Sequence, residues 1–165
     1  MTPLDAIRQE YDHEVKTTRR VLERVPDDRL GWRPHPKSMS LGQLALHIAA
    51  VPSIVAAMVQ ADSFEPPLGQ APEAKSRTEV LDRLTQSSAA LDTALKGLDD
   101  RRLHGNVSFT RNGQTFFEMP RMAVLRSILL NHSYHHRGQL SVYLRELDVP
   151  VPSIYGPSAD ENPFA

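Results

Sequence analysis

The stretch Asn131-His-Ser-Tyr-His-His-Arg-Gly-Gln-Leu-Ser-Val-Tyr-Leu-Arg145 decides how the rest of the chain is interpreted. His132 and His136 are four residues apart, so on an α-helix their imidazoles lie one turn apart on the same face. Extending that face in both directions collects Leu125, Ile128, Leu129, Leu140, Tyr143 and Leu147. These apolar spacings of three and four residues predict a helix whose two histidines face the protein core.

Two inward histidines allow two interpretations. A buried imidazole needs a partner for each ring nitrogen that water no longer reaches. Neighbouring hydrogen-bonding groups can supply that partner, and so can a metal ion shared by both rings. This helix alone does not choose between them, and a third ligand from another helix would favour the metal.

Amphipathic patterns predict four helices, at residues 3–26, 40–61, 76–97 and 120–147. The first opens with Thr2 as N-cap and Pro3 at the first helical position. The second and third open with the capping-box patterns Ser-Leu-Gly-Gln at 40–43 and Ser-Arg-Thr-Glu at 76–79.

Two connections are informative. Residues 62–75 are rich in proline and form a long crossover loop, and residues 105–118 alternate around Asn112-Gly113, the pattern of a hairpin with a type I′ turn. The sequence therefore predicts an all-α fold: a four-helix bundle with one long crossover loop and a small β-hairpin between the third and fourth helices. We expect residues 1–165 to form a single domain.

A third inward histidine comes from the second helix. His47 lies in its apolar stripe, three residues after Leu44 and four before Val51. Metal sites in helical bundles are built from inward side chains on facing helices. Three imidazoles without a fourth protein ligand form the ligand set of a catalytic divalent metal, since structural zinc sites are usually closed by four protein ligands.

Composition excludes several classes of protein. The 165 residues are 40% hydrophobic and 24% charged, as in globular proteins, and the net charge of −1 includes no basic cluster for nucleic acid. The N-terminus has no secretory signal, and the apolar stretch 44–59 is shorter than the ~20 residues of a membrane span. We therefore expect a cytoplasmic protein that binds neither nucleic acid nor membrane.

The chain resembles the DinB-like, or YfiT-like, metalloenzymes. The resemblance rests on Trp-Arg-Pro at 32–34, Ser-Leu-Gly-Gln-Leu-Ala-Leu-His at 40–47, Asn-His-Ser-Tyr-His-His-Arg-Gly-Gln at 131–139 and Pro-Ser-Ile-Tyr-Gly-Pro-Ser-Ala-Asp-Glu at 152–161. It places the family's histidine triad at His47, His132 and His136. It further implies a divalent metal ion, zinc or nickel, and a homodimer that acts on a small-molecule substrate. Imidazole ligands would also suit iron.

Related bacillithiol and mycothiol transferases imply a reaction: the metal would activate a low-molecular-weight thiol for S-transfer. This chain has no cysteine, so the sulfur would have to arrive with a cosubstrate. A metal-dependent hydrolase is the second hypothesis, because a divalent metal also activates water. A non-catalytic metal-binding stress protein is the third.

Further residues are candidates for supporting roles. Gln139 lies seven residues after His132 and could hydrogen-bond a ligand histidine or a substrate; alternatively, it could tie the helix to the C-terminal tail. Glu14, and less favourably Glu10, could accept a hydrogen bond from a metal-bound imidazole and so orient it, as carboxylates usually do in such sites. His135 is rotated about 100° from His136 and is expected to lie outside the cluster.

Overall fold

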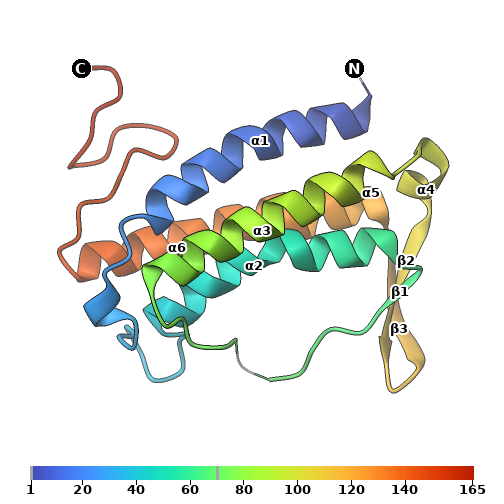
Figure 1. The fold of residues 1–165 in the computed structure, drawn as a ribbon, viewed down its shortest axis with the longest axis horizontal. Helices are drawn as coiled ribbons and strands as arrows, with labels where there is room; N and C mark the ends of the chain where they lie inside the picture. The colour runs from blue at the N-terminus through green and yellow to red at the C-terminus, as the bar shows by residue number, and fades with distance from the viewer. Residues whose placement is uncertain (1, 70) are drawn as a thin grey trace.

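The computed structural model describes residues 2–69 and 71–165 of the chain (Figure 1). Within them, four long helical segments form the body of the molecule, and a small sheet lies at one end of it. The elements are α1 (Pro3–Leu22), η1 (Asp27–Arg29), α2 (Leu41–Gln60), β1 (Ser63–Phe64), α3 (Arg77–Lys96), α4 (Asp100–His104), β2 (Asn106–Arg111), β3 (Gln114–Pro120), α5 (Arg121–Ala123), η2 (Val124–Asn131) and α6 (His132–Glu146).

Side-chain hydrogen bonds cap the N-termini of α2 and α3 and fix where these helices begin. In α2 the Ser40 hydroxyl accepts from the Gln43 amide at 3.1 Å, and the Gln43 side chain accepts from the Ser40 amide at 3.0 Å. This is the capping box predicted from the sequence. At α3 only half of the predicted box forms, because Glu79 Oε2 accepts from the amide of Lys75 at 2.6 Å, and not from that of Ser76.

The fourth predicted helix is one continuous helical run made of three parts, α5, η2 and α6. Its middle part, η2, is a π-helix, in which the amide of His132 donates to the carbonyl of Ser127, five residues earlier. The wider turn places an extra residue immediately before the histidine pair. π-Helical turns occur mostly inside α-helices, and frequently at functional sites.

The sheet is larger than the predicted hairpin. β2 and β3 pair antiparallel around Asn112 and Gly113, whose φ angles of 52° and 75° suit the predicted type I′ turn. β1 adds a third strand parallel to β2, with Phe64 beside Phe109. The prediction of an all-α fold with one hairpin is therefore corrected to a mostly helical fold with a three-stranded sheet.

The core divides into two apolar clusters. On α2, the buried residues up to Ala49 belong to one cluster and those from Val51 onward to the other. On the last helical run, the division falls between Leu130 and Leu140. The candidate ligands lie close to this division: His47 precedes it on α2, and His132 and His136 lie within it on the last helical run.

The length of α2 corrects one expectation from the sequence. Among the described residues it alone is long and apolar enough to cross a membrane: it has 20 residues, with a mean hydropathy of 1.7 over its most apolar window. The apolar stretch estimated as 44–59 was therefore too short. However, 67% of that window is buried inside the protein, as in the core helix of a globular domain.

The crossover between α2 and α3, residues 61–69 and 71–76, is termed the strap. At its far end Ser40 Oγ donates to Glu73 Oε1 at 2.6 Å, and Gln43 Nε2 donates to the carbonyl of Ala71 at 3.0 Å. The residues that cap α2 thus also hold the strap. Gly42 lies between them, and a Cβ there would be only 2.5 Å from Glu73 Oε1.

Candidate metal centre

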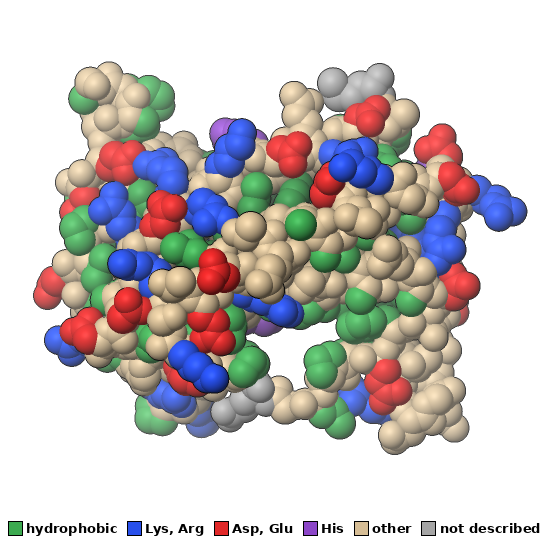
Figure 2. Space-filling view, viewed as in Figure 1, with side chains coloured by type: hydrophobic (Ala, Val, Ile, Leu, Met, Phe, Trp, Pro, Cys, Tyr) green, Lys and Arg blue, Asp and Glu red, His purple; other side chains and the backbone are tan. Residues whose placement is uncertain are grey.

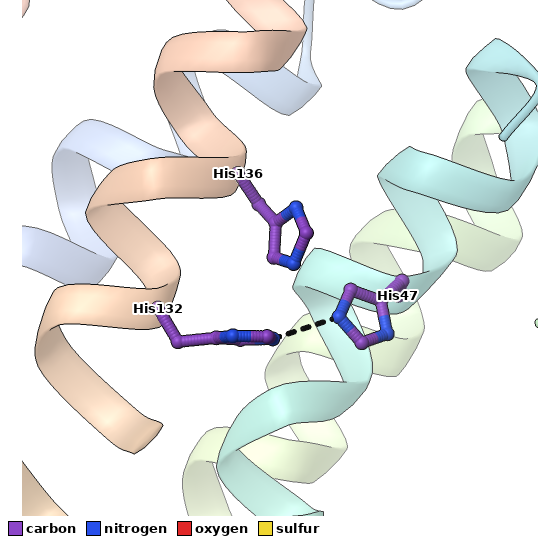
Figure 3. A group of neighbouring side chains, drawn as sticks. All are labelled: His47, His132 and His136. Atoms are coloured by element: carbon purple, nitrogen blue, oxygen red, sulfur yellow. Dashed lines mark hydrogen bonds between the residues drawn. The ribbon is translucent and has the colours of Figure 1, made fainter. Parts of the chain in front are cut away.

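The three inward histidines meet between α2 and α6 (Figure 3). Their ligand nitrogens all lie within 4.8 Å of one another, and the Nε2 atoms of His47 and His132 are 2.9 Å apart. The planes of the three rings are steeply inclined to one another, at angles of 71°, 84° and 86°. Three lone pairs can therefore converge on one point from different directions.

The spacing fits a divalent metal ion. Nitrogen ligands about 2.0–2.1 Å from a tetrahedral zinc ion are roughly 3.3 Å from one another. The observed 2.9 Å between two of the nitrogens and the limit of 4.8 Å for the group lie on either side of that value. Small rotations of the imidazoles would be enough to close the set around an ion.

Burial keeps these histidines neutral. It lowers the pKa of His47 and His136, and it lowers the pKa of His132 to about 4, with further contributions from the neighbouring imidazoles. A charged imidazolium is disfavoured in a poorly solvated site, particularly beside others of its kind. Near pH 7 the rings therefore offer lone pairs, as metal ligation requires.

Gln139 fixes the orientation of one ring. Its Oε1 lies 2.6 Å from Nδ1 of His136, and because an amide oxygen can only accept, Nδ1 carries the proton. The lone pair of His136 is then on Nε2. The Gln139 side chain thus takes the first of the roles considered from the sequence, a hydrogen bond to a candidate ligand.

Glu14 has contacts other than those expected from the sequence. Its Oε2 accepts from Arg137 Nη2 at 2.5 Å and from the Tyr155 hydroxyl at 2.8 Å. Arg137, only 1% exposed, also donates to the Glu14 carbonyl and to Thr18 Oγ1. Glu14 therefore forms a buried ion pair that joins α1, α6 and the C-terminal tail, and is not brought to the histidines.

The other candidates lie outside the cluster. Glu10 accepts from the Tyr134 hydroxyl at 2.6 Å and from Arg126 at 2.8 Å. The exposed His135 ring contacts that of His136 with 4.9 Å between centroids, but does not join the ligand group. Its place agrees with the rotation expected for adjacent helical residues.

Arg137 is the residue near the site whose burial sequence reasoning missed. It forms a salt bridge with Glu14, yet it is among the largest fully buried side chains. Its guanidinium also lies 5.0 Å from the Tyr155 ring centroid. The one signal in the sequence was the tail motif with Tyr155, which has no apolar pattern of its own and needed a partner in the body of the protein.

A mostly helical fold with three converging histidines defines a candidate metalloprotein. The model of the DinB family matches residues 1–163, and the chain belongs to that family. It is 30% identical over 159 residues to YrdA, a protein of uncharacterised function from Bacillus subtilis (strain 168), with 96% of this chain and 91% of YrdA covered.

Solved structures share the fold. A DinB-like protein from Bacillus cereus ATCC 10987 superposes with a TM-score of 0.74 and 25% identity, covering 92% of this chain and 97% of that one. A mycothiol-dependent maleylpyruvate isomerase superposes with a TM-score of 0.58 and 15% identity, covering 92% of this chain and 63% of the isomerase. At that identity the second likeness concerns the fold alone.

Proposed function

We propose that this chain is a metal-dependent enzyme, a single-domain four-helix bundle in which His47, His132 and His136 hold a divalent metal ion. The observation that carries the proposal is the convergence of three ring nitrogens within 4.8 Å. Imidazole ligands suit zinc, nickel and iron. Zinc and nickel come first because the family resemblance implies them.

The number of ligands favours catalysis over a structural role. Among the described residues no aspartate, glutamate or cysteine joins the three histidines. Catalytic metal sites keep a position open for water or substrate, whereas structural zinc sites are usually closed by four protein ligands. His47 also lines a cavity of about 1000 Å³ beneath the strap, which gives a substrate access to one side of the site.

The reaction we propose is S-transfer from a low-molecular-weight thiol. A bound divalent metal lowers the pKa of a thiol, so that a thiolate is available near pH 7. The chain contributes three neutral imidazoles, with His136 oriented by Gln139, and no cysteine of its own. The fold shared with a mycothiol-dependent isomerase supports a thiol cosubstrate.

Metal content tests the first part. Elemental analysis of protein purified without chelators should give about one metal ion per chain. His136→Ala should lose it and His135→Ala should retain it, because the second ring lies outside the ligand group. Equal metal content in these two variants would contradict the ligand assignment.

Cobalt substitution tests the reaction. Adding cysteine or glutathione to the cobalt protein should produce a sulfur-to-cobalt charge-transfer band, as expected for a thiolate bound at the open position. No band with either thiol, together with hydrolysis of an activated ester, would favour the hydrolase. If neither the charge-transfer band nor ester hydrolysis is observed, the remaining hypothesis is a metal-binding stress protein without catalysis.

The cellular setting is part of the proposal. We propose that the protein is cytoplasmic, as its composition indicates, and that it acts on a small molecule as a homodimer, as the family resemblance implies. Sedimentation equilibrium of the metal-loaded protein gives the mass of the assembly directly, and a monomer at all concentrations would remove the dimer from the proposal.

A further inference from the structure

The geometry points to a binding groove beneath the strap for an uncharged, largely apolar organic molecule. We assign it as the site of the second substrate, the one that would receive the thiol. That assignment rests on the proposed function; the groove and its preference for apolar ligands rest on the structure of the walls.

The strap stands away from the body of the protein. It is tied at one end by the pairing of β1 with β2 and at the other by Ser40 and Gln43, and between these ties it spans a cavity of about 1000 Å³. Figure 2 shows the opening between the strap and the helices. A volume of this order is at the upper end of small-molecule sites.

The inner wall of the groove is an apolar stripe of α2. Leu46, Ala50, Ile54 and Met58 line the cavity at successive intervals of four residues, so they form one row along the helix. Facing them, the strap supplies Phe64, Pro66, Pro67 and Leu68. Leu68 is 81% exposed, an unusual state for so large an apolar side chain. Apolar surface on two opposed walls favours an apolar body between them.

The third wall is polar and carries both signs of charge. Glu79, Asp82 and Arg83 line the cavity from α3, with Gln86 further along the same helix. The opposite charges on this wall largely offset one another, so it offers an ion little net attraction, whereas a neutral molecule can hydrogen-bond to it along one edge. The walls together therefore select an uncharged molecule with few polar groups.

The groove leads to the candidate metal centre. His47 follows Leu46 and lines the same cavity, while its Nε2 faces His132 at 2.9 Å (Figure 3). One end of a bound molecule thus lies beside a candidate metal ligand. This continuity separates the groove from an incidental surface hollow and favours a substrate as its occupant.

Titration with Nile red, an uncharged apolar dye whose fluorescence rises and shifts to the blue in apolar surroundings, tests the groove. Wild-type protein should bind the dye saturably. Ala50→Trp fills the groove, and Leu68→Asp places a charge on its outer wall; each should weaken binding about ten-fold or more. Ala6→Trp makes the matched substitution at an exposed position of α1, outside the cavity lining, and should bind as wild type does.

The groove would be overturned by absence of saturable binding to the wild type, or by equal binding by wild type, Ala50→Trp and Leu68→Asp. Dye binding that appears only on dilution, as a dimer dissociates, would assign the groove to a second copy of the chain and also overturn the proposal. The exposed Leu68 makes its variant a safe test if Ala50→Trp fails to fold.

Metal content measured on the same samples separates the two proposals. His136→Ala should bind Nile red as wild type does, because His136 does not line the cavity. Dye binding without metal in the wild type would uphold the groove and reject the metal enzyme. Metal binding without dye binding would reject the groove and uphold the metal site.

Discussion

Gln139 holds the ring of His136 through a single hydrogen bond of 2.6 Å between Oε1 and Nδ1. The two residues are three apart on α6, so one helical turn supplies both a candidate ligand and the group that orients it. The bond assigns the proton to Nδ1 and leaves Nε2 facing the other two histidines.

Gln139→Leu should therefore weaken metal binding without removing a ligand. Loss of the partner of a metal-bound histidine typically costs 10- to 100-fold in affinity, so a decrease of about that size is expected in competition with a chromophoric chelator. Gln139→Glu keeps an acceptor and should bind near the wild-type level. Gln9→Leu, at an exposed position of α1, is the control. Unchanged affinity in Gln139→Leu would mean that His136 needs no orientation.

The histidine cluster should make the metal-free protein sensitive to mild acid. An imidazole has a pKa near 6.5 in the unfolded chain, whereas burial lowers that of His132 to about 4 in the folded one. Between these values the unfolded state binds a proton that the folded state excludes, so stability falls as pH falls from about 6.5 to about 4. Above about 6.5 this group makes no contribution.

Thermal unfolding of the metal-free protein across this range checks the expectation. The Tm should fall less steeply for His132→Gln than for the wild type, and His13→Gln, at an exposed position of α1, should follow the wild type. If Tm falls equally steeply with pH for all three proteins, His132 is not the source of the acid sensitivity.

The buried pair of Arg137 and Glu14 should be costly to break. Removing one partner of such a pair leaves an uncompensated buried charge, so Arg137→Met should lower the free energy of unfolding by about 3–5 kcal/mol. Glu14→Leu combined with Arg137→Met removes both charges and should recover most of that loss. Arg8→Met breaks a pair whose side chains are 35% and 51% exposed, and should cost less than about 1 kcal/mol. Urea denaturation of the three variants and the wild type would reject the expectation if Arg137→Met and Arg8→Met cost the same.

Two glycines should respond in opposite directions to alanine. In Gly42→Ala the new methyl group displaces the Glu73 carboxylate from Ser40, costing about 1–2 kcal/mol for the lost charge-assisted hydrogen bond. Apart from the adjacent residues and the backbone of α6 itself, no described atom lies within 4 Å of a Cβ at Gly138, so Gly138→Ala should stabilise α6 by about 0.5–1 kcal/mol. Denaturant midpoints for the two variants on the same side of the wild type would contradict this.

The helices could be predicted because local signals specify them. Ser40, Gln43 and the apolar stripe of the second helix carry enough information to place its start, and the spacing of His132 and His136 places both on one face. The hairpin followed from Asn112-Gly113, which tolerate the positive φ angles of the turn. In each case neighbouring residues determine the structure.

The remainder depends on contacts distant in the sequence. β1 is two residues long, too short to show a period, and exists because β2 offers it an edge. Glu14 and Tyr155 are separated by most of the chain, so their meeting with Arg137 was not visible in any local pattern. The groove likewise depends on how far the strap stands from α2, which its length permits but does not determine.

The π-helical segment η2 has a consequence for how the family is compared. Its carbonyls are bonded five residues ahead, so the run from Val124 to Asn131 holds one residue more than regular α-helical winding would need. Deleting one residue there would turn His132 and His136 by about 100° relative to the preceding core residues. The phase of the histidine pair therefore depends on the one additional residue in this segment. A relative with an unbroken α-helix must be aligned with a one-residue gap before its histidines, and a gapless alignment would pair ligands with the wrong face.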